Sequence, residues 1–205
     1  MIGIIDYGSG NVSAIANIYK RLNIDYFVTN QPDKLIEATH LILPGVGAFD
    51  QTMRLLIDSG LRDSLDDLVL VKKTPILGIC VGMQIMAESS EEGVEKGLGW
   101  IKGRVIKINE SQLLKKPKLP HMGWNNIISR KSNQILDQVD QEKGFYFLHS
   151  YFMQPENAED IVATVNYGED LASIVRRDNV IGIQCHPEKS HSNGVQVFQN
   201  FSQIL

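Results

Sequence analysis

The first hundred residues alternate short apolar runs with segments of helical periodicity. Four apolar runs predict buried strands, at residues 2–6, 24–29, 41–43 and 75–79. Apolar residues spaced three or four positions apart, or an initial proline, predict helices at residues 12–22, 32–38, 53–70 and 81–88. Strands that alternate with helices are typical of βαβ units, so this half of the chain is predicted to form a parallel sheet.

Beyond residue 100 the pattern changes to strand-like runs without long helices between them. These runs lie at residues 103–108, 125–128, 145–152, 161–167, 173–176 and 180–184. A last helix is predicted from the spacing of Val195, Phe198, Phe201 and Leu205. The fold class is therefore α/β: an open, largely parallel central sheet flanked by helices, with additional mixed or antiparallel strands in the second half. No repeat or long linker divides the chain, so residues 1–205 are expected to form a single domain.

Composition narrows the classes of partner. With 43% hydrophobic and 21% charged residues the chain is typical of globular proteins, and its net charge of −4 disfavours nucleic-acid and anionic-membrane binding. The lysines at 115, 116 and 118 are the only basic cluster, which a solvated loop explains. There is no signal-peptide pattern or long apolar stretch, and the two cysteines fit neither a disulfide scaffold nor a zinc site. We expect a cytoplasmic protein without a metal or cofactor.

The most informative chemical feature is a cysteine between two glycines at the end of an apolar run. Cys80 stands in the sequence Gly-Ile-Cys-Val-Gly, residues 78–82, where a predicted strand gives way to a predicted helix. Such a turn lifts a reactive side chain out of the fold, and the unpaired N–H groups of a helix start favour a thiolate. We interpret Cys80 as a nucleophile at the carboxyl end of a central strand; the alternative is a small buried cysteine in a glycine-rich turn.

A histidine and a carboxylate near the C-terminus complete a candidate triad. A thiolate needs a base to move protons, and the base needs a partner that holds its tautomer. His186 and Glu188 flank Pro187, which favours an extended conformation in which residues two apart project to the same side. His186 is therefore the candidate base and Glu188 its orienting acid.

Backbone amides are the candidate donors to a developing oxyanion. The amide of Val81 follows the nucleophile directly, and a second amide could come from the glycine-rich loop at residues 44–47. Plain turn chemistry is the alternative for that loop. The glycines at residues 8 and 10 could also begin a dinucleotide-binding motif, but its third glycine would fall at Ser13, so we set this interpretation aside.

These residues resemble the class I, triad-type glutamine amidotransferases along essentially the whole chain. The nucleophile segment 77–84 and the His-Pro-Glu segment 186–190 carry the resemblance. Among small members, the chain is most similar to the glutaminase subunits of imidazole glycerol phosphate synthase. That closer similarity is carried by residues 6–11, 43–49, 120–125 and 146–151. One departure is Cys185, where phenylalanine is common in the family; we expect it only to pack.

The resemblance implies a flavodoxin-like fold and hydrolysis of L-glutamine to glutamate and ammonia through a thioester on Cys80. By matching position, Val46 and Val81 should frame the oxyanion. Four residues should bind the substrate: Gly47, Gln84, Ser150 and Tyr151. The alternatives are that Gln84 is merely solvated and that Ser150 and Tyr151 only pack within a strand.

The resemblance also implies a partner, because the chain has no room for a synthase domain. That partner is a (β/α)8-barrel cyclase that takes the ammonia and forms imidazole glycerol phosphate and aminoimidazole carboxamide ribonucleotide in histidine biosynthesis. The candidate interface residues of this heterodimer are Asn11, Trp124, Tyr146 and Lys189. We expect Cys80 to be poorly active until the partner is occupied.

Three other functions remain open on the sequence alone. A paralogous glutaminase could supply ammonia to a different synthase, such as one that amidates a surface sugar. The chain could also be another Cys-His-acid hydrolase, or a regulatory subunit without catalysis.

Overall fold

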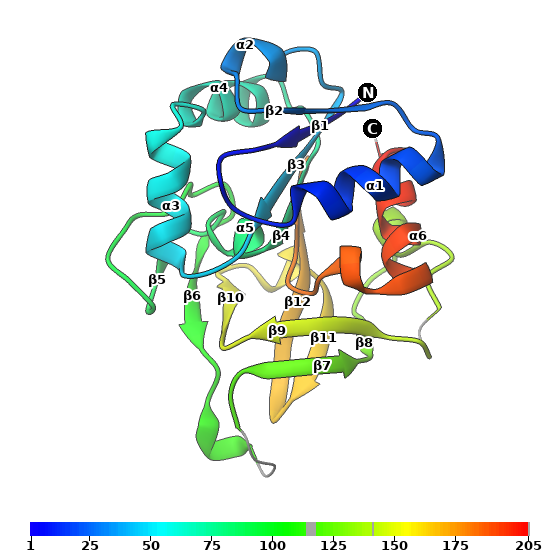
Figure 1. Cartoon of the computed structure of the whole chain (residues 1–205). Coiled ribbons are helices and arrows are strands. Elements are labelled where there is room, and N and C mark those ends of the chain that lie inside the picture. The colour runs from blue at the N-terminus through cyan, green and yellow to red at the C-terminus, as the bar shows by residue number, and fades with distance from the viewer. Residues whose placement is uncertain (114–117, 141, 205) are drawn as a thin grey trace.

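A computed structural model describes residues 1–113, 118–140 and 142–204 of the chain (Figure 1). Its centre is an eight-stranded sheet with the strand order β2-β1-β3-β4-β13-β12-β11-β8. The strands of this sheet are β1 (Ile2–Ile5), β2 (Tyr26–Thr29), β3 (His40–Gly45), β4 (Ile76–Cys80), β8 (Ile127–Ser129), β11 (Ile161–Tyr167), β12 (Glu169–Arg177) and β13 (Val180–Ile183). The first five strands in this order pair in parallel and the last three pair antiparallel, which confirms the predicted fold class.

Helices cover the two faces of the parallel strands. They are α1 (Val12–Leu22), α2 (Pro32–Leu35), α3 (Phe49–Asp58), α4 (Arg62–Asp66), α5 (Val81–Gln84) and α6 (His191–Phe201). Shorter helical turns span Asp67–Val71, Glu110–Gln112, Gln134–Leu136, Ala158–Asp160 and Pro187–Lys189. Helices α1 and α6 lie on one side of the sheet, and α3 and α4 lie on the other (Figure 1). Tyr19 of α1 and Phe198 of α6 pack together, with their ring centroids 5.4 Å apart.

Two small sheets accompany the central one. Strand β7 (His121–Asn125) pairs antiparallel with β9 (Phe145–His149), which makes a two-stranded ribbon. Strand β6 (Gly103–Lys107) lies between β10 (Tyr151–Pro155) and β5 (Ser89–Ser90). The prediction of one strand over residues 145–152 is therefore wrong, because the chain pairs with β7 up to His149 and with β6 from Tyr151. The run 125–128 likewise joins the end of β7 to the start of β8.

Two predicted helices are shorter than their apolar patterns. The region 53–70 is broken at Gly60, whose φ of 71° ends the helix begun at Phe49. Helix α5 ends at Gln84 rather than at residue 88, because the carbonyls of Ile85 and Ala87 accept from Leu98 and Gly99 instead of from the next helical turn. Helix α2 ends at Leu35 rather than at residue 38.

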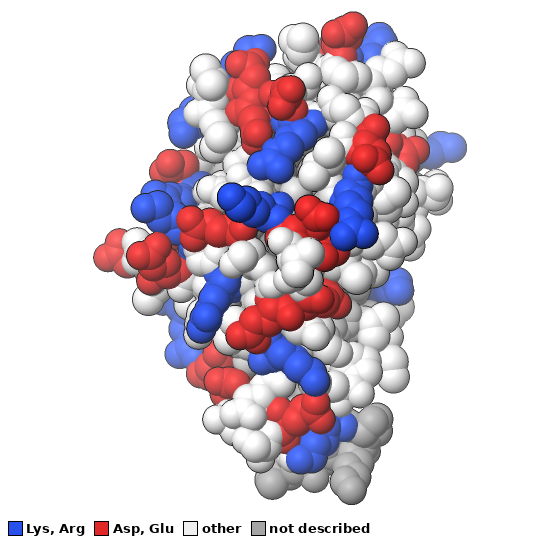
Figure 2. All heavy atoms as spheres, turned by 90° about the vertical axis from the view of Figure 1, so that its left-hand side faces the viewer, with Lys and Arg blue, Asp and Glu red and all other residues white. Residues whose placement is uncertain are grey.

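Three residues named in the predictions lie outside the described ranges: the lysines at 115 and 116, and Leu205. The last helix, α6, ends at Phe201. Within those ranges no helix is both long and apolar enough to cross a bilayer. Acidic and basic side chains alternate over the face shown in Figure 2. Around α3, Arg54 lies 2.9 Å from Glu95 and 3.9 Å from Asp50.

The parallel strands meet the turn after β4 with almost no space between backbones. A Cβ atom on Gly82 would lie 2.0 Å from the carbonyl oxygen of Leu43, and one on Gly45 would lie 2.3 Å from the amide nitrogen of Gly82. The end of β3 and the first turn of α5 therefore pack backbone against backbone. Only glycine fits at these positions.

We expect Gly82→Ala to lower the free energy of unfolding by about 3 kcal/mol, because a backbone carbonyl cannot yield to the new methyl group. Gly60→Ala is the matched control: its Cβ would meet nothing within 4 Å, so it should lose only about 1 kcal/mol from its left-handed backbone. Urea unfolding of both variants measures the difference. Equal losses would mean that the contact between β3 and α5 tolerates a side chain.

Candidate active site

Cys80 lies at the centre of the sheet, at the carboxyl end of β4. Its register partner in β3 is Gly45, and the preceding Ile79 pairs with Ile183 of β13, so three strand ends converge beside the thiol. The backbone of Cys80 has φ 55° and ψ −114°, a conformation that non-glycine residues adopt rarely and at a cost. This strained turn joins β4 directly to α5 and aims the side chain away from the strand.

His186 and Glu188 form a buried pair. His186 Nδ1 lies 2.9 Å from Glu188 Oε1, and the two side chains are 4% and 2% exposed. The segment is not strand-like as expected: His186 is extended, but Pro187–Lys189 is a turn of 3-10 helix. This turn, rather than strand alternation, folds the carboxylate back onto the ring. The main chain of His186 is also held, because its N–H donates to Tyr146 and its carbonyl accepts from the Ser190 hydroxyl.

The environment favours the protonated form of His186. Burial alone would lower the pKa of this imidazole, but hydrogen bonding to Cys80 and Glu188 and their negative charges raise it to about 10. The Nδ1 of His186 faces the carboxylate, so Nε2 is the nitrogen left for the thiol side. The arrangement can hold a proton next to a thiolate and release it to a leaving group.

A cavity of about 480 Å³ opens over this group. It is lined by Val46, Gly47, Cys80, Val81, Gln84, Glu92, Pro120, Leu148, His149, Ser150, Tyr151, His186 and Lys189. The structure thus brings together the predicted nucleophile, the predicted base and all the predicted oxyanion and substrate residues. Glu188 lies behind His186, outside the lining.

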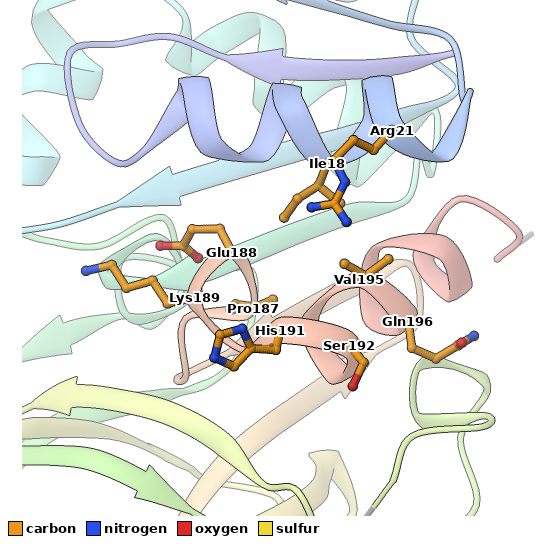
Figure 3. Close-up of a pocket in the computed structure, with 9 residues that line it drawn as sticks. All are labelled: Ile18, Arg21, Pro187, Glu188, Lys189, His191, Ser192, Val195 and Gln196. Carbon is orange, nitrogen blue, oxygen red and sulfur yellow. The ribbon is translucent and has the colours of Figure 1, made fainter.

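A second cavity, of about 650 Å³, lies on the far side of Glu188 (Figure 3). Ile18 and Arg21 reach into it from α1, opposite the start of α6. Glu188 Oε2 is buried and has no hydrogen-bond partner among the described residues. Neither Cys80 nor His186 lines this cavity, so it backs the carboxylate and does not hold the reacting groups.

Gln84 enters the first cavity with its amide nitrogen already engaged. Its Nε2 donates to the carbonyl of Tyr151 at 2.9 Å and to Gln184 Oε1 at 3.0 Å, and the residue is 3% exposed. The two N–H bonds are thereby used, which leaves the Oε1 atom as the group Gln84 can offer to a ligand. Gln84 is therefore not a solvated helix residue, the alternative weighed from the sequence.

Sequence reasoning missed Glu92, an acidic residue in the cavity wall. One oxygen of its carboxylate accepts from the amide of Phe49, at the start of α3, at 2.8 Å. The contact spans 43 positions of the chain and follows no local pattern. Glu92 gives the cavity a negative charge suited to an ammonium group.

His149 was also missed, although it lies within a segment that carried the family resemblance. Its Nδ1 lies 2.9 Å from the Tyr151 carbonyl, which can only accept, so its Nε2 must accept from His121 Nδ1 at 3.0 Å. Burial, and then the charges of His121 and His186, lower the pKa of His149 to about 3. Burial lowers the pKa of His121 to about 4. Both imidazoles are neutral at pH 7.

The amide expected to donate to the oxyanion from the glycine-rich loop already has a partner. The N–H of Val46 donates to the hydroxyl of Ser9 at 3.0 Å, and that hydroxyl lies 3.1 Å from the Val46 carbonyl. Val81, in contrast, is the first residue of α5, where N–H groups have no acceptor within the helix. Of the two predicted donors, the amide of Val81 has no hydrogen bond within the helix, and the amide of Val46 is bonded to the Ser9 side chain.

Three of the four predicted interface residues form one cluster. Trp124 and Tyr146 have ring centroids 6.4 Å apart, and Lys189 Nζ lies 5.7 Å from the Tyr146 ring. The cluster borders the active site, because the Tyr146 ring lies 6.5 Å from His186. Asn11 has a different place: it caps α1 by accepting from Ala14.

Cys185, the departure from the family pattern, is 1% exposed. Burial, and then the charges of Glu188 and Cys80, raise the pKa of its thiol well above the ordinary value. Cys185 is therefore held as a neutral thiol in the core, which agrees with a packing role.

With this geometry in view, comparison with known proteins gives the class. The chain belongs to the class I glutamine amidotransferases, because the family model described as glutamine amidotransferase class-I matches residues 3–204. Among solved structures, a glutamine amidotransferase crystal structure superposes with a TM-score of 0.74 at 17% identity, covering 98% of this chain and 97% of that one. At that identity the superposition shows the fold alone.

Full-length relatives narrow the class to one kind of subunit. The imidazole glycerol phosphate synthase subunit HisH of Leptospira borgpetersenii is 48% identical over 204 residues, and the alignment covers 100% of both chains. The HisH subunit of Bdellovibrio bacteriovorus is also 48% identical over 204 residues, and HisH 2 of Pseudomonas aeruginosa is 42% identical over 205. The resemblance to these glutaminase subunits, predicted from the sequence, is confirmed.

The neutral histidine pair makes stability depend on pH. An unfolded histidine takes up a proton below about pH 6.5, whereas buried His149 does so only near pH 3, so protons favour the unfolded state and stability falls as the pH falls. We expect a loss of roughly 1.5 kcal/mol from His149 between about pH 6.5 and about pH 5. His186, whose pKa is raised, changes the pH dependence of stability only above this pH range. Carboxyl groups whose pKa is lowered, such as that of Asp170, change it only below this range.

Urea unfolding of His149→Gln at both pH values tests this dependence. The variant should lose less stability on acidification than the parent chain, whatever its stability at pH 6.5. Exposed His191, changed to Gln, is the control and should keep the parent dependence. An unchanged dependence in His149→Gln would contradict a neutral, buried His149.

Proposed function

We propose that this chain hydrolyses L-glutamine to glutamate and ammonia through a thioester on Cys80, with His186 and Glu188 completing the triad. The observation that carries the proposal is the placement of Cys80 and His186 in one cavity, with Glu188 bonded to the far side of the His186 ring. The family match over residues 3–204 supports both the reaction and a single domain.

The reaction follows from the order of these groups. The Cys80 thiolate attacks the side-chain amide carbon of glutamine, and the carbonyl oxygen becomes an oxyanion facing the amides of Val81 and Val46. His186 gives its proton to the departing nitrogen, the C–N bond breaks, and ammonia leaves a thioester. Water then adds while His186 takes one of its protons, the C–S bond breaks, and glutamate is released. The sum is glutamine plus water giving glutamate plus ammonia.

The cavity walls fit the amino-acid end of glutamine. Glu92 and Gln84 Oε1 are acceptors suited to the α-ammonium group. Gly47, Ser150 and Tyr151 line the same cavity and can supply the remaining contacts through their main chain and side chains. A substrate with an acyl group but no ammonium would leave the Glu92 charge unpaired, which weighs against a general ester or peptide hydrolase.

The ammonia passes to a cyclase subunit, which we propose to be a (β/α)8 barrel that docks near Trp124, Tyr146 and Lys189. Met122 and Trp124 of β7 are 61% and 48% exposed, large apolar side chains suited to such a contact. Similarity along the whole chain to HisH subunits favours histidine biosynthesis over an amidotransferase for surface sugars. Cys80 and Cys185 are both free thiols, as suits a cytoplasmic protein.

Cys80→Ala should abolish glutamate release, with a loss of at least roughly 10³-fold in the complex with the cyclase, because no other thiol reaches the cavity. A glutamine-like affinity label should mark Cys80 and not Cys185, and Cys185→Ala should retain turnover. The assay measures glutamate and the cyclase product together. Parent-rate ammonia from Cys80→Ala would refute the mechanism, and ammonia accepted only by a sugar amidotransferase would refute the histidine assignment.

The Ser9 hydroxyl should restrain the enzyme when no partner is bound. It holds the N–H of Val46, so this amide cannot donate to an oxyanion until that bond breaks. Ser9→Ala removes one hydrogen bond, and we expect partner-free glutaminase turnover to rise severalfold, up to about tenfold.

The measurement is kcat of the isolated chain with saturating glutamine. The half-buried Ser64, changed to Ala, is the control, since it lies on α4 and does not line the cavity. If Ser9→Ala lowered partner-free turnover, the hydroxyl would be helping the Val46 loop to work and not restraining it.

A further inference from the structure

Gln184 is a buried amide that the proposed mechanism has not used. It follows the last residue of β13 and is completely buried. Its main-chain N–H donates to the carbonyl of Ser173 on β12 at 2.8 Å, which fixes the start of the side chain. From there the amide nitrogen reaches to 3.9 Å from Cys80 Sγ, and the amide oxygen accepts from Gln84 Nε2 at 3.0 Å.

The direction of these hydrogen bonds is determined by a backbone carbonyl. The carbonyl of Tyr151 can only accept, so the Gln84 atom 2.9 Å away must be its amide nitrogen. That nitrogen also contacts Gln184, so Gln184 must present its oxygen there. The nitrogen of Gln184 is then the atom that faces sulfur. Every other orientation of the two amides places two donors or two acceptors against each other.

We propose that Gln184 is a positioning residue for the glutaminase reaction: its Nε2–H donates to the Cys80 thiolate while its Oε1 orients Gln84. The inference rests on the proposed function and adds a residue to it. A buried thiolate needs donors to replace the water it has lost, and the amide supplies one without adding a proton that could be transferred. The same amide keeps Gln84 aligned, so the nucleophile and the substrate acceptor share one support.

The two contacts of Gln184 predict effects that can be separated. Gln184→Met keeps the length of the side chain and removes both hydrogen bonds. Gln84→Met removes the Gln84 contacts but leaves the donor to sulfur in place. Only Gln184→Met should therefore change the thiolate, whereas both variants should weaken glutamine binding.

Iodoacetamide alkylation of the full chain over a range of pH measures the thiolate directly, with mass spectrometry locating the label on Cys80. For Gln184→Met we expect the midpoint of the alkylation profile to rise by about one pH unit, equivalent to about tenfold less thiolate at a given pH below it. For Gln84→Met the midpoint should stay at the parent value while KM for glutamine in the complex rises.

Ile183→Val is the structural control, a buried residue next to Gln184 whose shortening should cost about as much stability as a lost hydrogen bond. It should change neither the midpoint of the alkylation profile nor KM for glutamine. If Gln184→Met does not fold, Gln184→Leu replaces it, with the same expectation. A parent-like alkylation midpoint in a folded Gln184 variant would overturn this inference, and the proposed function would still stand on Cys80-dependent turnover. Loss of that dependence would instead refute the function.

Discussion

The whole site depends on the contact between the end of β3 and the first turn of α5. Leu43 and Gly45 approach Gly82 so closely that no side chain fits between them. This contact keeps α5 against the sheet directly after β4, and Cys80 at the junction takes up a left-handed backbone as a result. The same approach puts the loop at Val46 beside the first amide of α5. The proposed nucleophile and the proposed oxyanion donors are thus neighbours because two backbones pack without side chains between them.

The sequence was sufficient for the parallel half of the fold, and it picked out the residues proposed to react, which the structure places together. Three of the four apolar runs in this half are strands buried on both faces, β1, β3 and β4, and Cys80, His186 and Glu188 lie in short motifs. Where one run contained two strands, as at residues 145–152, prediction failed, because hydrophobicity does not record which strand is the partner. The predicted end of α5 was wrong for a similar reason. The amides of residues 98 and 99 donate to the carbonyls that a longer helix would use.

Three of the residues that sequence reasoning missed share one physical property. Ser9, Glu92 and Gln184 act through contacts with residues 37, 43 and 100 positions away. Polar residues with only long-range partners leave no periodic trace, and each is compatible with a surface position until the fold is known. Glu188 is the opposite case: the motif suggested its proposed role as the orienting acid, but not the turn that bends it onto His186.

The β7–β9 ribbon has two faces that meet different parts of the protein. Met122 and Trp124 project outward, where the cyclase is proposed to dock, and alternate with His121, which projects inward. His121 bonds to His149, whose other nitrogen shares the Tyr151 carbonyl with Gln84, and Gln84 bonds to Gln184 beside the thiol. The side chains of His121, His149, Gln84 and Gln184 are buried and neutral, so a shift of the ribbon would pass from one hydrogen-bond partner to the next along this series. A partner that moved the outer face of β7 would therefore act on the residues proposed to orient Cys80.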